Sequence, residues 1–293
     1  MKARAPLGRE GVATALLAKA LLAGAILAIA GCPRVPPPNL ARDPAALLDQ
    51  VRAAQDRVRR VRGSARVKVS SPGLSGTVNA FAAAEKPDRV HLTTLDFFGN
   101  PVTVLAASGG RFGLWDAREN VYYRGEATPE NVSRLLPVLL PVEELVVVLC
   151  GSAPILPGRP LEVGVQDGFV LLTVGEGAVG QRLGLGEGAA VEWSRVRRRV
   201  EGPGGARDVA HAYDLAFDGF RRRGGVRFPM AVKLDAPAGR SQVELTWKDD
   251  LEVNADPTPA LFQADPPRGA RVVELPPGGS PPPVSFPADA PRE

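Results

Sequence analysis

The sequence has few of the residues that usually carry catalysis or bind metals. The 293 residues include two cysteines and two histidines, and the acidic residues are scattered along the chain. This number of cysteines and histidines is too small for the clustered ligands of a zinc site. The motifs G-x-S-x-G, H-E-x-x-H and Walker A are also absent. We therefore expect a protein that is not an enzyme and that holds no metal and no cofactor.

The N-terminal region lacks an apolar run long enough to span a membrane. Residues 20–30 are apolar, which is about half of the roughly 20 residues that a spanning helix needs. Basic residues precede this run and small residues end it, as in a secretory signal. The sequence Ile29-Ala30-Gly31-Cys32 resembles the lipobox of bacterial lipoproteins.

This pattern predicts that residues 1–31 are a signal peptide and that Cys32 becomes a diacylated N-terminus. Two acyl chains are enough for stable membrane anchoring. Pro33 stands where enteric lipoproteins of the inner membrane tend to have Asp, which points to the outer membrane. The Pro-rich residues 32–42 then serve as a stiff tether. The alternative is an ordinary secretory signal with an incidental cysteine.

The second cysteine stands in a different setting. Cys150 ends the apolar run 145–149, which is typical of a small buried hydrophobic residue. With Cys32 acylated, Cys150 has no partner for an intramolecular disulfide.

The positive charge of the whole chain is misleading. The formal net charge is +4, but residues 1–31 hold four basic residues and one acidic residue. The mature chain is therefore close to neutral, and we expect no nucleic-acid partner. Basic clusters lie at residues 57–60, 195–199 and 221–223. We interpret them as solvated faces or turns, with contact to anionic lipid as the alternative.

Periodicity divides the remaining chain into elements. Asp43-Pro44 begins a predicted amphipathic helix at residues 44–61, which Gly63 would end. Period-two alternation and turns then predict antiparallel strands up to Tyr123. Two helices begin at Thr128 and near Pro141. The predicted strands after the helices are near residues 161–166, 168–174, 189–200, 207–217, 226–235 and 240–248.

The spacing predicts one domain, residues 43–275, in which the helix pair covers or plugs the sheet. Residues 256–277 look irregular, and the Pro-rich tail 276–293 is expected to be disordered. Residues 175–180 match the dinucleotide-binding pattern G-x-G-x-x-G, but further glycines up to Gly188 make the required helix improbable. We predict a series of β-turns there.

One loop has unusual side chains. Phe97 and Phe98 stand beside the turn residues Gly99-Asn100-Pro101, where polar residues are normal. Both rings could fold back into the core. We favour exposure for Phe98 and leave both alternatives open for Phe97. An exposed aromatic residue at a loop tip is suited to insertion into a bilayer or to contact with an acyl chain.

Several segments together resemble the LolA/LolB family, and in particular LolB-like outer-membrane lipoproteins. The similarity covers roughly residues 60–270 and rests on the order of the segments more than on identical residues. The matching segments are residues 86–92, 98–102, 110–115, 122–125, 148–151 and 261–270.

The resemblance implies an α+β fold: a half-open antiparallel β-barrel with an N-terminal helix and a helix pair at its concave face. It implies an apolar cavity that receives the acyl chains of lipoprotein cargo from a LolA-like periplasmic carrier. In the family, a leucine before the glycine of one loop protrudes and inserts cargo into the membrane, and Phe98 stands at that position. The tail and the insert around residues 175–190 depart from the family pattern.

The sequence thus predicts a lipid-anchored, periplasm-facing lipoprotein of the outer membrane. It would bind acyl chains and take part in the transfer of lipoproteins or lipids, with Phe97, Phe98 and Gly99 as the insertion loop. The alternative is a structural lipoprotein that binds other envelope proteins through its sheet edge or its tail.

Overall fold

The computed structural model describes residues 34–133, 140–176, 179–201, 207–237 and 240–276, and for residues 198–212 only the backbone. The predicted signal peptide, Cys32 and residues 277–293 of the tail lie outside these ranges. Within them, none of the helices has the length and apolar character needed to cross a membrane.

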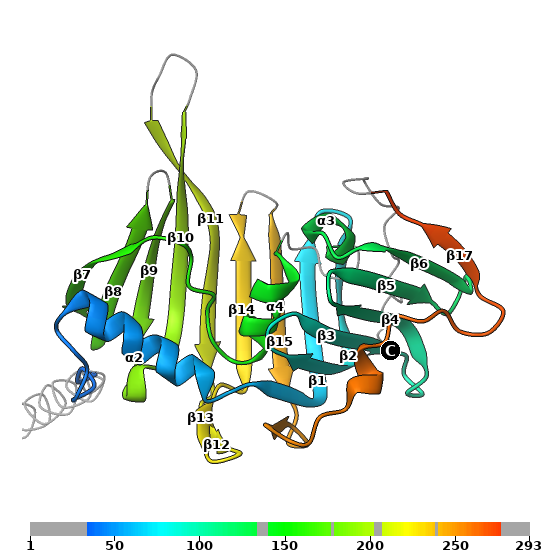
Figure 1. The fold of residues 1–293 in the computed structure, drawn as a ribbon, viewed down its shortest axis with the longest axis horizontal. Coiled ribbons are helices and arrows are strands. Elements are labelled where there is room, and N and C mark those ends of the chain that lie inside the picture. The colour runs from blue at the N-terminus through cyan, green and yellow to red at the C-terminus, as the bar shows by residue number, and fades with distance from the viewer. Residues whose placement is uncertain (1–33, 134–139, 177–178, 202–206, 238–239, 277–293) are drawn as a thin grey trace, which may run out of the picture.

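Nearly all of the strands belong to one sheet of 15 strands (Figure 1). The neighbours along the sheet are β17-β6-β5-β4-β3-β2-β1-β15-β14-β11-β10-β9-β8-β7, and β16 pairs with β1. The pairing is antiparallel except between β17 and β6. The strands are β1 (Arg60–Ser71), β2 (Leu74–Glu85), β3 (Arg89–Leu95), β4 (Pro101–Ser108), β5 (Arg111–Asp116), β6 (Val121–Glu126), β7 (Arg159–Gln166), β8 (Phe169–Glu176), β9 (Val179–Leu185), β10 (Val191–Glu201), β11 (Arg207–Asp218), β14 (Ala231–Ala236), β15 (Ser241–Trp247), β16 (Glu252–Val253) and β17 (Arg271–Glu274). A separate hairpin consists of β12 (Arg221–Arg223) and β13 (Val226–Phe228).

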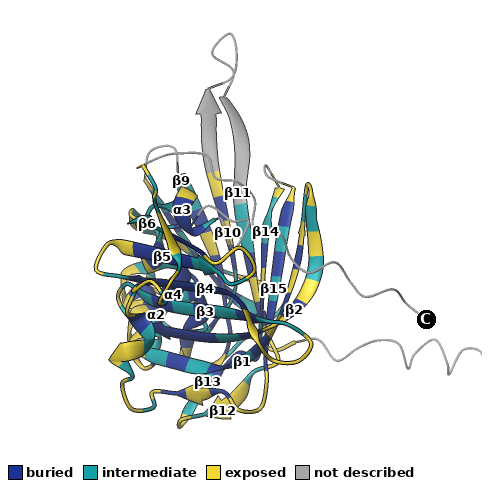
Figure 2. Cartoon of the chain, turned by 90° about the vertical axis from the view of Figure 1, so that its right-hand side faces the viewer, coloured by how far each residue is buried: buried dark blue, intermediate teal, exposed yellow. Residues whose placement is uncertain are grey.

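The sheet is curved and open. Strands β3 to β5 run across the direction of β10, β14 and β15, so the sheet bends around a concave face (Figure 2). Its end strands, β7 and β17, lie at opposite ends of the sheet order and do not pair. This architecture confirms the predicted half-open antiparallel barrel.

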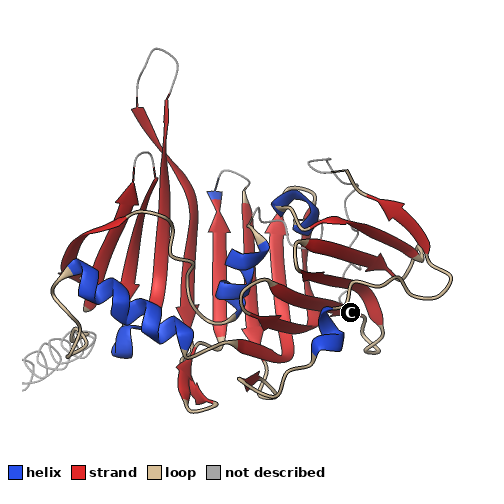
Figure 3. Ribbon diagram, in the orientation of Figure 1, coloured by secondary structure: helices blue, strands red, loops and turns tan. Residues whose placement is uncertain are grey.

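The helices are α2 (Pro44–Asp56), α3 (Pro129–Val132), α4 (Val142–Leu149), and the short 3-10 helices η1 (Glu187–Ala189) and η3 (Pro259–Phe262). Helices α2 and α4 lie on the concave face of the sheet (Figure 3), whereas η3 contacts β3 and β4 on the opposite face. Asp43 caps α2, because its Oδ1 accepts a hydrogen bond from the backbone N–H of Ala46 at 2.8 Å. Leu47, Leu48 and Val51 of α2 are buried. The helix contacts β7, β8 and η1, whereas α4 contacts β2 and β3.

Alternation along the strands separates the concave core from the convex surface. In β1, Ala65, Val67 and Val69 are buried, while the intervening Arg66 and Lys68 are exposed. The inward-facing residues join those of α2 and α4 in one hydrophobic core. The alternating pattern therefore places an aliphatic surface beneath the helices.

The predicted helix 44–61 is too long. The helix ends at Asp56, and β1 already begins at Arg60. Asn254 holds the connection, because its Oδ1 accepts from the N–H of Arg59 at 2.8 Å and its Nδ2 donates to the carbonyl of Arg57 at 2.6 Å. This contact joins residues far apart in the sequence.

The prediction that Gly63 ends the helix is also wrong, because Gly63 lies inside β1. A Cβ atom at this position would come within 2.8 Å of the Cα of Leu251. The absence of a side chain therefore allows two backbone segments to pack closely.

Four strands were not predicted. Residues 179–185 form β9 and not part of a turn series, residues 221–223 form β12, residues 252–253 form β16, and residues 271–274 form β17 in a segment that looked irregular. The predicted strand 226–235 is divided into β13 and β14. Glycines at positions 180 and 184 weaken the strand signal of β9. The rejection of a dinucleotide-binding turn is confirmed, because a strand and not a helix follows the pattern.

Candidate functional site

A small apolar cavity lies between the concave face of the sheet and α4. Its volume is about 40 Å³. All of its lining side chains are aliphatic: Val67, Val90, Leu92, Leu105, Leu145, Val148, Leu149, Val232, Leu234, Val243 and Leu245. We refer to this space as the apolar cavity. A surface of this kind has no group that could do chemistry, but it matches hydrocarbon.

Helix α4 fills most of the space above this part of the sheet. Leu145, Val148 and Leu149 come from the helix, and the other lining residues come from β1, β3, β4, β14 and β15. Pockets that hold small organic ligands usually have about 300–1,000 Å³. The cavity is therefore too small for such a ligand while α4 is in place, and displacement of α4 would expose the aliphatic strand residues.

Among the described side chains, one hydrogen bond joins α4 to the sheet. The hydroxyl of Tyr213 on β11 donates to Oε2 of Glu144 at 3.3 Å. Burial raises the pKa of Glu144 above its usual value, and the hydrogen bond from Tyr213 opposes this shift. Burial also raises the pKa of Tyr213. The helix is thus held mainly by apolar packing and by one half-buried hydrogen bond.

Cys150 stands at the C-terminal end of α4. Its side chain is buried and its thiol is free, which confirms the prediction of a small buried hydrophobic residue. Burial raises the pKa of the thiol to about 12. The group is therefore protonated and unreactive while the helix is in place.

The loop between β3 and β4 exposes two aromatic rings. Phe97 is 96% exposed and Phe98 is 85% exposed, and their ring centroids lie 5.5 Å apart in an edge-to-face arrangement. Both rings therefore point into solvent, and neither folds back into the core. Their role in membrane insertion remains a prediction.

Hydrogen bonds within the loop hold the two rings at the tip. Oδ1 of Asp96 accepts from the N–H of Phe98 at 2.9 Å and from that of Asn100 at 2.8 Å. The side chain of Asn100 donates to Oδ2 of Asp96 at 3.1 Å. These bonds, led by that of Asn100, lower the pKa of Asp96. Gly99 has φ +86°, which a glycine adopts without strain. The exposed pair is thus part of an ordered turn.

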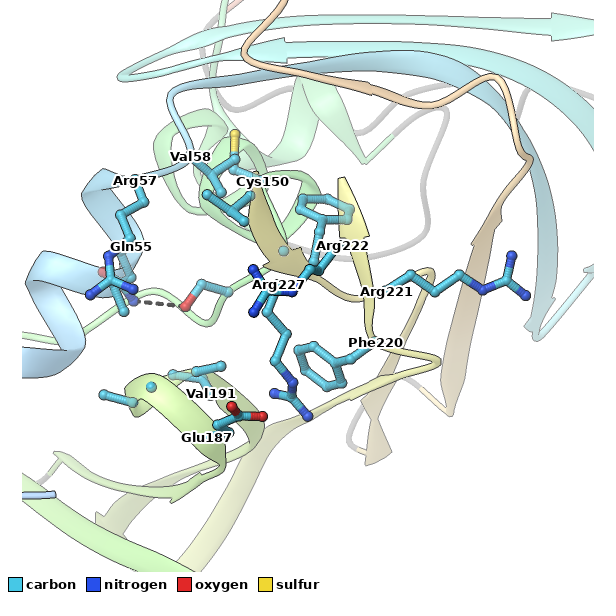
Figure 4. A pocket seen from close by; sticks show the side chains of 18 of the residues that line it. Gln55, Arg57, Val58, Cys150, Glu187, Val191, Phe220, Arg221, Arg222 and Arg227 are labelled. Carbon is cyan, nitrogen blue, oxygen red and sulfur yellow. Dashed lines mark hydrogen bonds between the residues drawn. The ribbon is translucent and has the colours of Figure 1, made fainter. Parts of the chain in front are cut away.

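A second, larger pocket has a volume of about 410 Å³ (Figure 4). Its walls are the end of α2, the turn after α4, the segment from η1 to the start of β10, and the β12–β13 hairpin. Four arginines line it: Arg57, Arg221, Arg222 and Arg227. We refer to it as the arginine pocket. Arg57 belongs to one basic cluster of the sequence, Arg221 and Arg222 belong to another, and Arg227 lies outside both. The sequence did not indicate that these residues meet.

The segment that follows the predicted anchor is docked on the sheet. Nη2 of Arg34 lies 2.7 Å from Oε2 of Glu192, and the guanidinium lies 4.0 Å from the ring centroid of Phe169. Further along, the N–H of Ala41 donates to Oε1 of Gln50 at 2.9 Å. Residues 34–42 are therefore not a free tether between Cys32 and the domain.

Solved structures of other proteins have a similar fold. A domain from Vibrio parahaemolyticus, named as an outer membrane lipoprotein-sorting protein, superposes with a TM-score of 0.52 and 10% identity, over 75% of this chain and 97% of that one. The chain has a LolA/LolB-like fold. A DUF1329 family protein from Desulfovibrio piger (TM-score 0.49, 13% identity, 76% and 95% covered) and a LolA superfamily protein from Nitrosomonas europaea (0.48, 8%, 74% and 96%) are also similar. No protein-family model and no curated protein matches the sequence.

The LolA/LolB-like fold brings only some of the predicted features together. Its helix pair lies at the concave face as expected. Cys32 lies outside the described residues, and Phe97 and Phe98 do not line the apolar cavity. Among the described residues, no group of three or more side chains has the arrangement of a metal site.

Proposed function

We propose that this protein is a lipid-anchored lipoprotein of the outer membrane, facing the periplasm, that binds acyl chains and takes part in lipoprotein or lipid transfer. The apolar cavity carries the proposal. Its lining contains aliphatic side chains alone, and one eight-residue helix covers it. In this account an acyl chain takes the place of Leu145, Val148 and Leu149 on the sheet as α4 moves away.

The energetics of such an exchange are balanced. Removal of α4 exposes apolar strand residues, and an entering acyl chain covers the same surface again. Each buried methylene contributes about 0.8 kcal/mol. A chain of ordinary length therefore offsets the loss of a few aliphatic helix side chains, so the helix and the chain can compete for one surface.

The exposed Phe97–Phe98 pair supplies the contact with the membrane in this proposal. Cys32, once diacylated, keeps the protein at the bilayer, and the ordered turn presents two rings to it. Cargo would arrive from a LolA-like periplasmic carrier. Contiguous exposed aromatic surface is a common mark of membrane or partner contact.

Transfer can be measured with the mature protein reconstituted in acceptor vesicles. A fluorescent diacyl lipopeptide is presented in donor vesicles, and its arrival in the acceptor vesicles is followed. We expect the protein to accelerate arrival. Leu245→Asn, which makes the cavity polar, should reduce the effect. Thr246→Asn, on the opposite face of the same strand, should leave it unchanged. Equal rates with and without protein would contradict the transfer function.

A second candidate function is supported by the edge strand β7. Leu161 and Val165 are 56% and 65% exposed there, and their backbone groups lie at the open end of the sheet. An apolar edge strand can pair with a strand of another chain. A structural role as a binding partner of other envelope proteins would use this edge. Protein crosslinks from β7, with no acyl chain in the cavity, would favour this role.

A further inference from the structure

We propose that the arginine pocket binds the phosphate of an anionic lipid headgroup while the acyl chains of the same lipid occupy the apolar cavity. This inference rests on the proposed acyl-chain function and specifies its ligand as a phosphate-bearing lipid. It follows from the charge balance of the pocket and from its position next to α4.

Two of the four arginines are engaged elsewhere. Arg221 lies 3.1 Å from Asp249 and extends away from the other arginines (Figure 4). Arg227 lies 3.1 Å from Oε1 of Glu192 and stacks 3.9 Å from the ring centroid of Phe220. These contacts fix the positions of both guanidinium groups. They do not use all of the donors, because Nη1 of Arg227 is buried without a hydrogen-bond partner.

The other two arginines make no side-chain hydrogen bond or ion pair with the described residues. Arg57 extends from the end of α2 and Arg222 from the β12–β13 hairpin, on different walls of the pocket (Figure 4). Glu187 is the one acidic residue in the lining, so the lining has an excess of positive charge. Guanidinium groups bind phosphate oxygens through paired N–H donors. The two free arginines suit a phosphate better than a neutral group.

The arginine pocket and the apolar cavity are lined by neighbouring residues of the same chain segments. Leu149 lines the cavity, and the next residue, Cys150, lines the pocket. On the other wall, Phe228 lines the pocket and Val232 lines the cavity. A ligand with an apolar tail beneath α4 would therefore reach the pocket at the C-terminal end of this helix. A diacyl lipid with a phosphate headgroup has this division of chemistry.

The test compares three probes on the mature protein in detergent micelles: dihexanoyl phosphatidic acid, dihexanoylglycerol and inorganic phosphate. Calorimetry should show that the phosphatidic acid binds more tightly than the diacylglycerol. Arg57→Gln/Arg222→Gln should weaken phosphatidic acid binding about tenfold or more, as expected for the loss of charge-assisted hydrogen bonds. It should leave diacylglycerol binding unchanged.

The control variant Arg66→Gln/Arg118→Gln removes the same charge at exposed positions outside both sites. It should bind both lipids as the wild type does. Equal affinity of the wild type for the two lipids would overturn the headgroup site and leave the acyl-chain function intact. Binding of neither lipid would overturn both. Inorganic phosphate binding as tight as that of phosphatidic acid would show a site for the free anion and would overturn the lipid-headgroup assignment.

Discussion

Glu192 connects the N-terminal segment to the arginine pocket. One oxygen of its carboxylate lies 2.7 Å from Nη2 of Arg34, and the other lies 3.1 Å from Nη2 of Arg227. The side chain of Glu192 is 11% exposed. If Cys32 is acylated, the anchor begins two residues before Arg34, and the β8–β10 part of the sheet is held close to the membrane.

Neutralisation of this carboxylate should release the N-terminal segment. Within the described part of the chain, Glu192→Gln leaves both arginines without an ionic partner, whereas Glu187→Gln alters an exposed neighbour that forms no ion pair there. The protein is held in membranes, and its cleavage by trypsin after Arg34 is measured by mass spectrometry. This cleavage should become about tenfold faster in Glu192→Gln. It should not change in Glu187→Gln. Equal cleavage in Glu192→Gln and in the wild type would contradict the docking.

The exposed phenylalanine pair gives a prediction for the membrane contact. Phe98→Glu should lower lipopeptide transfer between vesicles about tenfold, because transfer of one large apolar side chain from water contributes about 1.5–3 kcal/mol. Val165→Glu places the same charge at another exposed apolar position, on the edge strand β7. That control should transfer normally. Equal losses in both variants would indicate a general effect of negative charge and would remove Phe98 from the mechanism.

The attachment of α4 should depend on pH. The raised pKa of Glu144 means that the closed helix holds this proton more tightly than the open helix does. Closure is therefore most stable below the ordinary pKa of a glutamic acid and weakens as the pH rises through the raised value. The measurement is the rate of thiol labelling of Cys150, corrected for the thiolate fraction of the unfolded chain. This corrected rate should rise as the pH passes from the ordinary pKa of a glutamic acid to the raised pKa of Glu144.

Two substitutions test the assignment of this pH dependence. Glu144→Gln should abolish the acceleration, and Glu143→Gln, at the exposed neighbouring position, should retain most of it. A corrected labelling rate that does not vary with pH in the wild type would show that Glu144 does not report on the position of α4.

A buried amide gives a prediction for stability. Gln181 on β9 donates to the carbonyl of Pro154 at 2.7 Å and to Oγ of Ser194 at 3.0 Å, and it accepts from the N–H of Leu156 at 3.0 Å. Gln181→Leu leaves these groups unpaired in the core. The free energy of unfolding should fall by about 2–4 kcal/mol in urea denaturation. Ser194→Ala should cost only about 1 kcal/mol. Equal midpoints for the two variants would show that the amide does not organise this connection.

The sequence was sufficient to predict the start of α2 and the end of α4. Asp43 and Pro44 mark the start of α2, and Gly151 follows the end of α4, because caps and turns depend on neighbouring residues. The exposed Phe98 was also predictable, since it stands beside a turn glycine. These features need no knowledge of distant contacts.

The two cavities could not be derived in the same way. The arginine pocket joins Arg57 to Arg222, and only the path of the sheet brings these positions together. The docking of Arg34 depends on Glu192 in the same manner. The strand β9 was missed because its glycines resemble turn residues, and its stability comes from pairing with β8 and β10. Long-range pairing thus overrides the local preference.

Entry of acyl chains into the apolar cavity can be tested most directly with photo-leucine incorporated into the protein in living cells. The measurement is the mass of the adducts that form on irradiation. This analogue replaces leucine without a large change in shape. Irradiation should attach acyl-lipid masses to peptides that contain Leu145, Leu149 or Leu245. The exposed Leu161 on β7 provides the comparison outside the cavity. Adducts of acyl mass on the cavity leucines, at a higher yield than on Leu161, are the predicted result. Cavity leucines that crosslink only to other parts of the protein would contradict the account.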